Sequence, residues 1–425
     1  MAPSSRDVLL GYSTNVHKGE TLDQVYRFLR DFTLPIKRNV FGRGRGGLEL
    51  RIGIGVAREL REEAARTAFK HFLDANGLVL FSVNAFPLLD FHAPRVKERV
   101  YEPSWAEEER SRWTSLICEI LADLLPQGLT GTVSTLGGAF RREDPAIFRR
   151  LAAGYLRVIE ALARLEDERG KTVVLAVEPE PCTTFEDARD VIEFFESHLV
   201  PMARERGRGA SRRGLEDRLR KFFTVNFDTC HLSVLFEDLK GNLEAFRRAG
   251  IEVSKIHVTS AIRLENPLSR PKAYREFRRR REPRYLHQFC GKNATGRVIW
   301  RGLDLDELPR RLEPERSPNI VELRSHYHVP LHLKHLGLLQ TTREETAEAV
   351  IDAVQRGRCK QLVLETYTWP FLAREGDLVR GITREFRWLQ DLLGVGGSVR
   401  GLPWPVRTGT NREGLGHCAP GFPVG

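Results

Sequence analysis

Residues 225–231 read Val225-Asn226-Phe227-Asp228-Thr229-Cys230-His231. This stretch closes an apolar, β-prone run that begins at Phe222. Alternate side chains of a strand point to opposite faces, so Val225 and Phe227 share one face and Asp228 lies on the other. The apolar face predicts packing against neighbouring elements, and the polar face points the Asp228 carboxylate into a site.

The same arrangement occurs in three other apolar stretches, each of which ends in a polar side chain. Before Asp228 stands Val173-Val174-Leu175-Ala176-Val177-Glu178-Pro179-Glu180, and after it stand Lys255-Ile256-His257-Val258-Thr259 and Leu362-Val363-Leu364-Glu365. Alternation puts the branched apolar residues of each stretch on the outer face. Glu178, His257 and Glu365 therefore face inward, as Asp228 does.

Strand and helix patterns alternate along the chain of 425 residues. We predict strands at 8–14, 48–54, 78–84, 130–136, 172–178, 222–228, 254–259 and 361–366. We predict helices at 21–31, 56–75, 104–125, 144–168, 185–198, 239–249, 342–354 and 382–393. Eight such units predict a closed (β/α)₈ TIM barrel of the α/β class. A doubly wound open sheet is the alternative, but the glycine-rich stretch 42–47 does not link a strand to a helix, as a phosphate loop would.

The barrel is predicted to span residues 1–393, with two long connections. Residues 201–221, after the fifth strand, form a polar, strongly basic insertion that we expect to be partly mobile. Residues 261–323, after the seventh strand, are too long for an ordinary connection and predict an excursion over one end of the barrel. Residues 394–425 are rich in glycine and proline without periodicity, which predicts a disordered tail.

Composition and charge limit the classes of function. The formal charge is +10 and the pI about 9.5, which is compatible with a nucleic acid partner. Because the basic residues concentrate in the two insertions, we favour solvated surfaces instead. No apolar run is long enough to span a membrane, and the N-terminus lacks the features of a signal peptide. The six cysteines contain no CxxC pair, which predicts reduced thiols in a cytoplasmic protein.

Four polar side chains fall at the carboxyl ends of the last four predicted strands, where TIM barrels carry their active sites. They are Glu178, Asp228, His257 and Glu365. Three carboxylates at one place repel one another, and a divalent cation removes that repulsion. Carboxylates together with one imidazole are ligands for Mn²⁺, Mg²⁺, Co²⁺ or Zn²⁺. The sequence therefore predicts a divalent metal site and leaves the identity of the ion open.

Three further polar residues are candidate substrate contacts because they follow these strand ends or share their parity. They are Glu180, His231 and His328. His328 belongs to the sequence His326-Tyr327-His328. Two other polar residues follow the first and third strands, and for these we favour structural roles: His17 and Asn84.

The four strand ends resemble those of the xylose isomerase-like TIM barrel superfamily, which includes sugar isomerases, sugar epimerases and endonuclease IV. The matching motifs, in order, are Glu-Pro-Glu, Asp-Thr-Cys-His, Lys-Ile-His and Leu-Glu-Thr. The resemblance implies that Glu178, Asp228, His257 and Glu365 occupy metal-binding positions. It also implies that His231 touches substrate or a further metal.

Up to about Leu393, the chain is also similar to the EboE family, the metabolite traffic proteins of a bacterial operon. Five stretches carry this similarity: Gly-Tyr-Ser-Thr-Asn-Val-His (11–17), Arg-Val-Lys-Glu-Arg-Val-Tyr (95–101), Glu-Pro-Arg-Tyr-Leu-His-Gln (282–288), His-Tyr-His-Val-Pro-Leu (326–331) and Glu-Thr-Tyr-Thr-Trp (365–369). The resemblance implies a role in handling a small metabolite, with other proteins of the operon as partners.

Three functions are compatible with these observations. In the first, the protein is a metal-dependent isomerase or epimerase of a polar small molecule. The metal would bind adjacent substrate oxygens and stabilise an enediolate, and Glu178 and Glu365 are the candidate catalytic acid and base. The second is an endonuclease IV-like phosphodiesterase. It is favoured by the charge but opposed by His326-Tyr327-His328, which stands where that enzyme has Asp-x-His, and by the missing early histidines. The third is a non-catalytic barrel that binds a metabolite.

Overall fold

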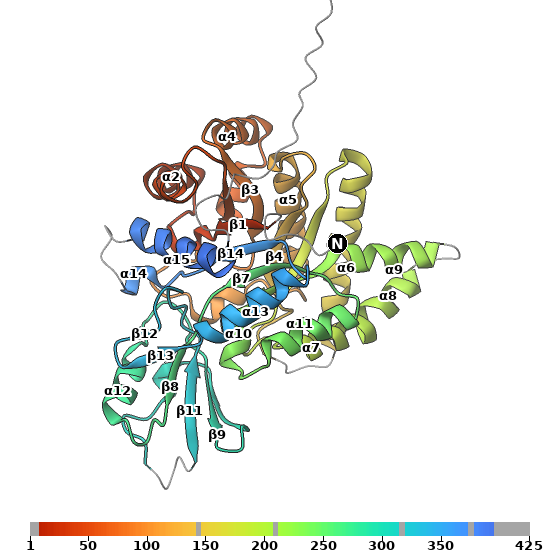
Figure 1. The fold of residues 1–425 in the computed structure, drawn as a ribbon. Helices are drawn as coiled ribbons and strands as arrows, with labels where there is room; N and C mark the ends of the chain where they lie inside the picture. The colour runs from red at the N-terminus through yellow and green to blue at the C-terminus, as the bar shows by residue number, and fades with distance from the viewer. Residues whose placement is uncertain (1–7, 142–145, 207–210, 314–318, 373–377, 395–425) are drawn as a thin grey trace, which may run out of the picture.

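The structure is a computed structural model, and it describes residues 8–141, 146–206, 211–313, 319–372 and 378–394. An eight-stranded parallel sheet lies at its centre (Figure 1), in the order β1-β14-β7-β6-β5-β4-β3-β2. A parallel bridge between Ser13 and Glu49 joins the two outer strands. The sheet thus forms a nearly closed barrel, and the predicted (β/α)₈ TIM barrel is confirmed.

Each barrel strand overlaps one of the eight predicted stretches. The strands are β1 (Leu9–Tyr12), β2 (Gly46–Arg51), β3 (Leu78–Asn84), β4 (Gly131–Leu136), β5 (Val173–Glu178), β6 (Phe223–Asp228), β7 (Val253–Val258) and β14 (Gln361–Leu364). Of these, β2 begins two residues before its predicted stretch and β7 one residue before. In register, Asp228 on β6 pairs with His257 on β7, and His257 pairs with Val363 on β14. The strand ends therefore bring the predicted site residues side by side.

Helices surround the barrel (Figure 1). They are α1 (Leu22–Phe28), α2 (Leu34–Phe41), α3 (Ile54–Glu59), α4 (Glu63–Ala75), α5 (Glu108–Leu124), α6 (Ile147–Arg169), α7 (Ala188–Phe194), α8 (Val200–Arg206), α9 (Ser211–Phe222), α10 (Thr229–Val234), α11 (Leu239–Arg248), α13 (Arg343–Gln355), α14 (Trp369–Leu372) and α15 (Leu378–Leu392). The predicted helix at 21–31 continues further, through Leu29–Thr33 into α2. It can do so because Pro35 lies in the first turn of α2, where no N–H donor is needed.

The two long connections have regular structure. The described residues of the basic insertion, 201–206 and 211–221, belong to helices α8 and α9, which project from the barrel in Figure 1. Apolar residues anchor these helices, because Ala203 and Leu219 are buried. The predicted tail 394–425, apart from Gly394, lies outside the described residues.

The excursion after β7 forms a second sheet at the side of the barrel (Figure 1). Its antiparallel strands are β8 (Ile262–Glu265), β9 (Phe289–Asn293), β10 (Val298–Gly302), β11 (Ile320–Ser325), β12 (His335–Leu336) and β13 (Leu339–Thr341). Helix α12 (Pro271–Arg279) packs on it through Tyr274 and Phe277, in an apolar cluster separate from the barrel core. The sheet reaches Thr341, beyond the predicted boundary at 323.

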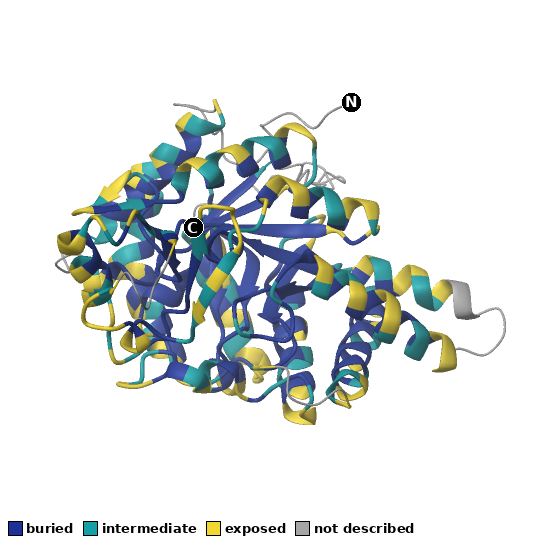
Figure 2. Cartoon of the chain, turned by 90° about the horizontal axis from the view of Figure 1, so that it is seen from below, coloured by how far each residue is buried: buried dark blue, intermediate teal, exposed yellow. Residues whose placement is uncertain are grey.

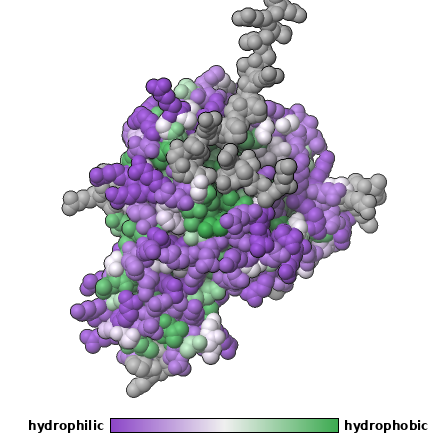
Figure 3. All heavy atoms as spheres, in the orientation of Figure 1, coloured by the Kyte–Doolittle hydropathy of each residue, from purple (hydrophilic) through white to green (hydrophobic). Residues whose placement is uncertain are grey.

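Burial follows this architecture. The central strands are buried, and exposed residues lie on the outer helices (Figure 2). On the face seen in Figure 1, most residues are hydrophilic, and hydrophobic residues gather near the middle (Figure 3). Among the described residues, no helix is both long and apolar enough to cross a membrane.

Candidate metal centre

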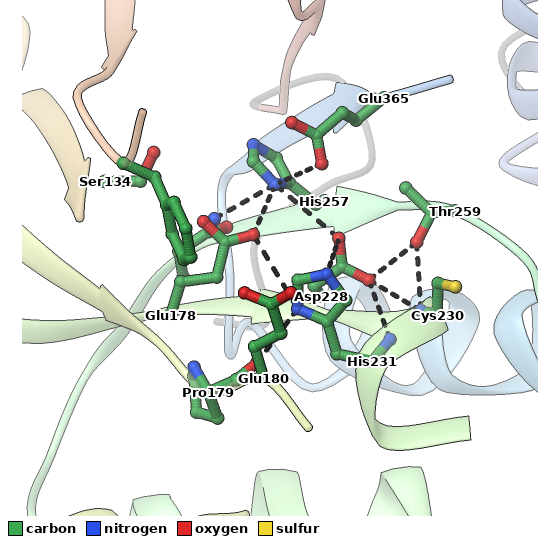
Figure 4. A network of polar contacts seen from close by, with 12 residues as sticks. Ser134, Glu178, Pro179, Glu180, Asp228, Cys230, His231, His257, Thr259 and Glu365 are labelled. Atoms are coloured by element: carbon green, nitrogen blue, oxygen red, sulfur yellow. Dashed lines mark hydrogen bonds and ion pairs between the residues drawn. The ribbon is translucent and has the colours of Figure 1, made fainter. Parts of the chain in front are cut away.

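Four side chains predicted as metal ligands meet at the carboxyl end of the barrel (Figure 4). Glu178, Asp228 and His257 lie at the ends of β5, β6 and β7, and Glu365 directly follows β14. One ligand atom from each of the four lies within 4.8 Å of the others. His257 Nδ1 lies 3.0 Å from Glu178 Oε1, 3.0 Å from Glu365 Oε2 and 3.7 Å from Asp228 Oδ2. The prediction that these strand ends converge is correct.

Two carboxylate oxygens at this place are buried and have no hydrogen-bond partner among the described residues. They are Glu178 Oε2 and Asp228 Oδ2. A buried carboxylate oxygen without a partner is costly, because burial removes its hydration. Three carboxylates and one imidazole, with two oxygens unpaired, form a donor set that fits a divalent cation.

The local geometry of Asp228 explains why one of its oxygens stays unpaired. Asp228 is the N-cap of α10, and its Oδ1 accepts from the backbone N–H groups of Cys230 (2.7 Å) and His231 (3.1 Å). Thr259 Oγ1 also donates to Oδ1, at 2.8 Å. Capping therefore occupies one oxygen and turns the other toward the imidazoles. Asp228 Oδ2 lies 3.8 Å from His231 Nε2 and 4.0 Å from His328 Nε2.

The three residues predicted to contact substrate lie in the same cavity, which holds about 530 Å³. His231 Nδ1 lies 2.9 Å from the Pro179 carbonyl, and His328 Nδ1 lies 2.8 Å from the Glu365 carbonyl. Glu180 Oε1 accepts from Tyr101 Oη at 2.9 Å. These side chains also form metal-competent groups of their own: Asp228 with His231 and His328, and Glu180 with His231 and His326.

Burial and neighbouring charges shift the titration of this cluster. Burial by itself lowers the pKa of His257, but the charges of Glu365, Glu49 and Glu178 outweigh it and hold that pKa well above the ordinary value. Burial raises the pKa of Asp228, but His231 and other imidazoles outweigh burial and bring it well below the ordinary value. The Asp228 carboxylate thus stays charged, which a metal ligand requires.

The pKa values of Glu365 and Glu180 shift in the opposite direction to that of Asp228. Burial, the largest cause, raises the pKa of Glu365 to about 7 and that of Glu180 to about 7. Burial also lowers the pKa of His328 to about 4. With several carboxyl groups in one buried space, ionisation of one disfavours ionisation of the next. A cation in the site would reverse this trend.

Sequence reasoning missed a residue on the opposite side of His257. Glu49, on β2, is fully buried, and its Oε1 lies 2.9 Å from His257 Nε2. The Lys255 ammonium donates to the other carboxylate oxygen of Glu49 and to Ser134 Oγ, the latter at 2.8 Å. The signal was present, because an acidic residue stands between Leu48 and Leu50 with the inward parity of its strand.

Two asparagines hold Glu365. Asn15 Nδ2 donates to Glu365 Oε1 at 2.6 Å, and Asn84 Nδ2 donates to the same oxygen at 3.1 Å. Asn84, for which we expected a structural role, thus lies next to the site and contacts one of its proposed ligands. His17, also expected to be structural, packs between Phe28 and Phe32 away from the four ligands.

Comparison with known proteins supports the fold. A xylose isomerase-like TIM barrel protein from Mycobacterium smegmatis, in complex with magnesium, is 12% identical; the match covers 92% of this chain and 99% of that one, with a TM-score of 0.50. A xylose isomerase domain protein from Planctomyces limnophilus is 12% identical over 91% and 96% of the two chains, with a TM-score of 0.46. An L-ribulose 3-epimerase is 11% identical over 91% and 95%, also at 0.46. The likeness to the Mycobacterium smegmatis protein, at 12% identity, shows a shared barrel fold.

No protein-family model matches the chain, and no curated protein matches it. The Mycobacterium smegmatis structure shares the barrel fold with this chain, and the resemblance of the motifs to the xylose isomerase-like superfamily stays a prediction. The resemblance to the EboE family stays a prediction.

Proposed function

We propose that this protein holds a divalent metal ion through Glu178, Asp228, His257 and Glu365, and that it acts on a small molecule by chemistry of the sugar isomerase or epimerase type. The observation that carries the proposal is a pair of buried, unpaired oxygens, Glu178 Oε2 and Asp228 Oδ2, on two of the four side chains that converge here. Without a cation, these two oxygens are desolvated and have no hydrogen-bond partner among the described residues.

The residues of the chain provide the remaining parts of such chemistry. When bound, the ion would supply Lewis-acid stabilisation of negative charge on substrate oxygens. The carboxylates of Glu178 and Glu365 approach His257 Nδ1 equally closely, and Asn15 and Asn84 fix the second of them. In the proposed reaction, one carboxylate takes a proton from a substrate carbon and the other returns it. The polar contacts proposed for the substrate are Glu180, His231 and His328.

The finer proposal, that the protein belongs to the EboE metabolite traffic family and works in the cytoplasm with partners from the same operon, has one supporting observation. Each of the five stretches that resemble that family contributes residues to the lining of the site cavity. These residues include Asn15, Val96, Tyr285, His326 and Tyr367. The resemblance is thus concentrated where a ligand would bind, as expected if the shared feature is recognition of a metabolite.

The first experiment is elemental analysis of the purified protein after reconstitution with Mn²⁺, Zn²⁺, Co²⁺ or Mg²⁺. We expect one of these ions in stoichiometric amount in the wild type and its loss in Asp228→Asn. Asparagine keeps the oxygen that caps α10, so the variant should fold. The matched control is Asp238→Asn, an exposed N-cap of α11 whose carboxylate accepts from the Lys240 N–H at 3.1 Å. Equal metal content in wild type and Asp228→Asn would contradict the proposed site.

Activity then separates the reaction classes. Metal-loaded wild type should interconvert a carbonyl compound and its isomer, and Asp228→Asn should not. Incision of abasic DNA, with binding that weakens steeply as salt increases, would favour the phosphodiesterase alternative. Tight binding of a metabolite by metal-free protein would favour the non-catalytic barrel.

A further inference from the structure

We propose that the substrate of this site is amphiphilic, with a pair of adjacent oxygens at the metal end and an apolar body about the size of a ring in the outer half of the cavity. This inference rests on the proposed metal function and names its class of substrate. It excludes the open-chain sugars that a polar cavity would select.

The cavity has two chemically different halves. Its inner half holds the metal-competent carboxylates and imidazoles. Its outer half is lined by apolar and aromatic side chains from three places: the connection after β3, the excursion, and the connection after β14. These side chains are Phe86, Phe91, Val96, Val100, Tyr285, Leu286 and Tyr367.

Aromatic rings form a packed wall in the outer half. The ring centroids of Phe91 and Tyr285 lie 4.6 Å apart, and those of Tyr285 and Tyr367 lie 4.9 Å apart at an interplanar angle of 76°. Together with Val96 they form one buried apolar cluster. Such packing gives a wall of defined shape that can accept a flat apolar group by edge and face contacts.

Three polar side chains in this outer half, those of Lys97, Tyr101 and Tyr285, are already engaged with the protein. The Lys97 ammonium donates to the carbonyls of Glu282 (2.9 Å) and Tyr285 (2.7 Å) and to the Asp304 carboxylate, so its three protons are used. The Tyr285 hydroxyl donates to the Phe91 carbonyl at 3.1 Å.

The hydroxyl of Tyr101 is engaged in the same way. It donates to Glu180 and accepts from Gln288 Nε2 at 2.8 Å. A sugar chain placed along this wall would lose the water around its hydroxyl groups and find few partners in exchange. An apolar group would lose nothing and would bury its own surface.

A pair of chelating probes tests the proposal. Acetohydroxamate and benzohydroxamate carry the same two adjacent oxygens, but the first has a methyl group where the second has a phenyl group. Each is titrated calorimetrically into the metal-loaded protein, and its affinity is divided by its affinity for the free ion. After this correction, we expect benzohydroxamate to bind at least about tenfold more tightly.

Two variants locate the effect. Val100→Thr adds a hydroxyl to a half-exposed lining residue without changing its shape, and Phe91→Ala removes a ring from the wall. Both variants should bind the metal as the wild type does, and both should reduce the preference for the phenyl probe severalfold. Val298→Thr, at a half-exposed position on β10 outside the cavity, is the matched control and should keep the full preference.

The outcomes separate this inference from the function on which it rests. Metal-loaded protein that binds both probes equally would overturn the amphiphilic substrate and leave the metal centre intact. A phenyl preference that survives in both lining variants would also overturn it, because the ring would then lie elsewhere. Protein that takes up no metal would overturn both proposals.

Discussion

Glu49, Lys255 and His257 form a buried polar line inside the barrel, below the proposed metal. Glu49 and Lys255 are both fully buried, and Ser82 Oγ donates to Glu49 at 2.6 Å. Glu49 thus faces one nitrogen of His257 while the other nitrogen faces the carboxylates. A carboxylate that contacts the far nitrogen of a ligating imidazole fixes its orientation and raises its basicity. We interpret Glu49 as a positioning residue.

Replacement of Glu49 by glutamine should therefore weaken metal binding without removing a ligand. In Glu49→Gln we expect the metal affinity to fall by about 10- to 100-fold, measured by competition with a fluorescent chelator. The matched control is Glu322→Gln, a buried, ion-paired glutamate of the second sheet. This control should lose stability but keep the metal affinity. A Glu49→Gln protein with wild-type affinity would remove the positioning role.

At the scale of the elements, single side chains fasten helices to strand ends. Tyr155 on α6 is fully buried and stacks on Trp105, with ring centroids 4.0 Å apart. Its hydroxyl donates to the Leu136 carbonyl at 2.8 Å and accepts from the Gly138 N–H at 2.9 Å. This pair of bonds ties the middle of α6 to the end of β4, next to the strand that carries Glu178.

Loss of this hydroxyl should destabilise the fold. For Tyr155→Phe we expect the free energy of unfolding to fall by about 1–3 kcal/mol, because a buried donor and acceptor lose their partner. Urea denaturation followed by circular dichroism measures this. Tyr26→Phe, at a half-buried position on α1, should stay within about 0.5 kcal/mol of wild type. Equal effects of the two substitutions would argue against the contribution of the bonds.

Glu385 on α15 holds the connection that follows Glu365. Its carboxylate accepts from Thr366 Oγ1 (2.8 Å), Trp369 Nε1 (2.8 Å) and the Leu331 N–H (3.1 Å). Burial raises the pKa of Glu385 above its ordinary value of 4.5, and these hydrogen bonds only partly oppose the shift. The folded state therefore retains a proton that the unfolded chain releases as the pH increases above 4.5.

This shift gives stability a pH dependence of known sign. The contribution of Glu385 is fully present below pH 4.5 and is lost as the pH increases through the raised folded-state pKa. Relative to Glu385→Gln, the wild type should thus lose stability as the pH increases from 4.5 through the raised folded-state pKa. Urea denaturation across this interval measures the difference. The control is Glu344→Gln, at an exposed position on α13, which should show no such trend relative to the wild type. If the wild type and Glu385→Gln differ by the same amount at every pH, the pKa of Glu385 is not raised.

At the scale of the whole molecule, the excursion and the barrel share the cavity. The backbone N–H groups of Val96 and Lys97 both donate to the Arg284 carbonyl, at 2.9 and 2.8 Å, and the Lys97 side chain holds the same segment. Residues 282–288 are thereby fixed against the 97–101 turn at the mouth of the barrel. The excursion therefore builds one wall of the site.

Removal of the Lys97 charge should loosen this wall. In Lys97→Met we expect faster amide hydrogen exchange over residues 282–288 and weaker binding of benzohydroxamate, with unchanged metal content. Hydrogen exchange followed by mass spectrometry measures the first effect. Lys240→Met removes an exposed lysine that pairs with Glu348 at 2.9 Å and should change neither property. Exchange that stays at the wild-type rate would show that other contacts hold the wall.

Sequence reasoning missed two parts of the structure. The strands of the second sheet are too short for a periodic pattern to predict them. In addition, β8 pairs with β11 and β13, which lie far along the chain. Glu49 has the right parity, but its partner Lys255 is 206 positions away. Pairings of this kind depend on which strands become neighbours, and only the folded chain decides that.

The sequence by itself determined the barrel and the direction of its functional side chains. Alternation along a strand is a local property, so Glu178, Asp228, His257 and Glu365 had to face inward once their strands formed. The tertiary structure decided what surrounds them. Closure of the barrel placed Glu49 behind His257, and the excursion brought Tyr285 to the aromatic wall. Periodicity acts over a few residues, whereas the shape and polarity of a cavity depend on contacts between distant segments.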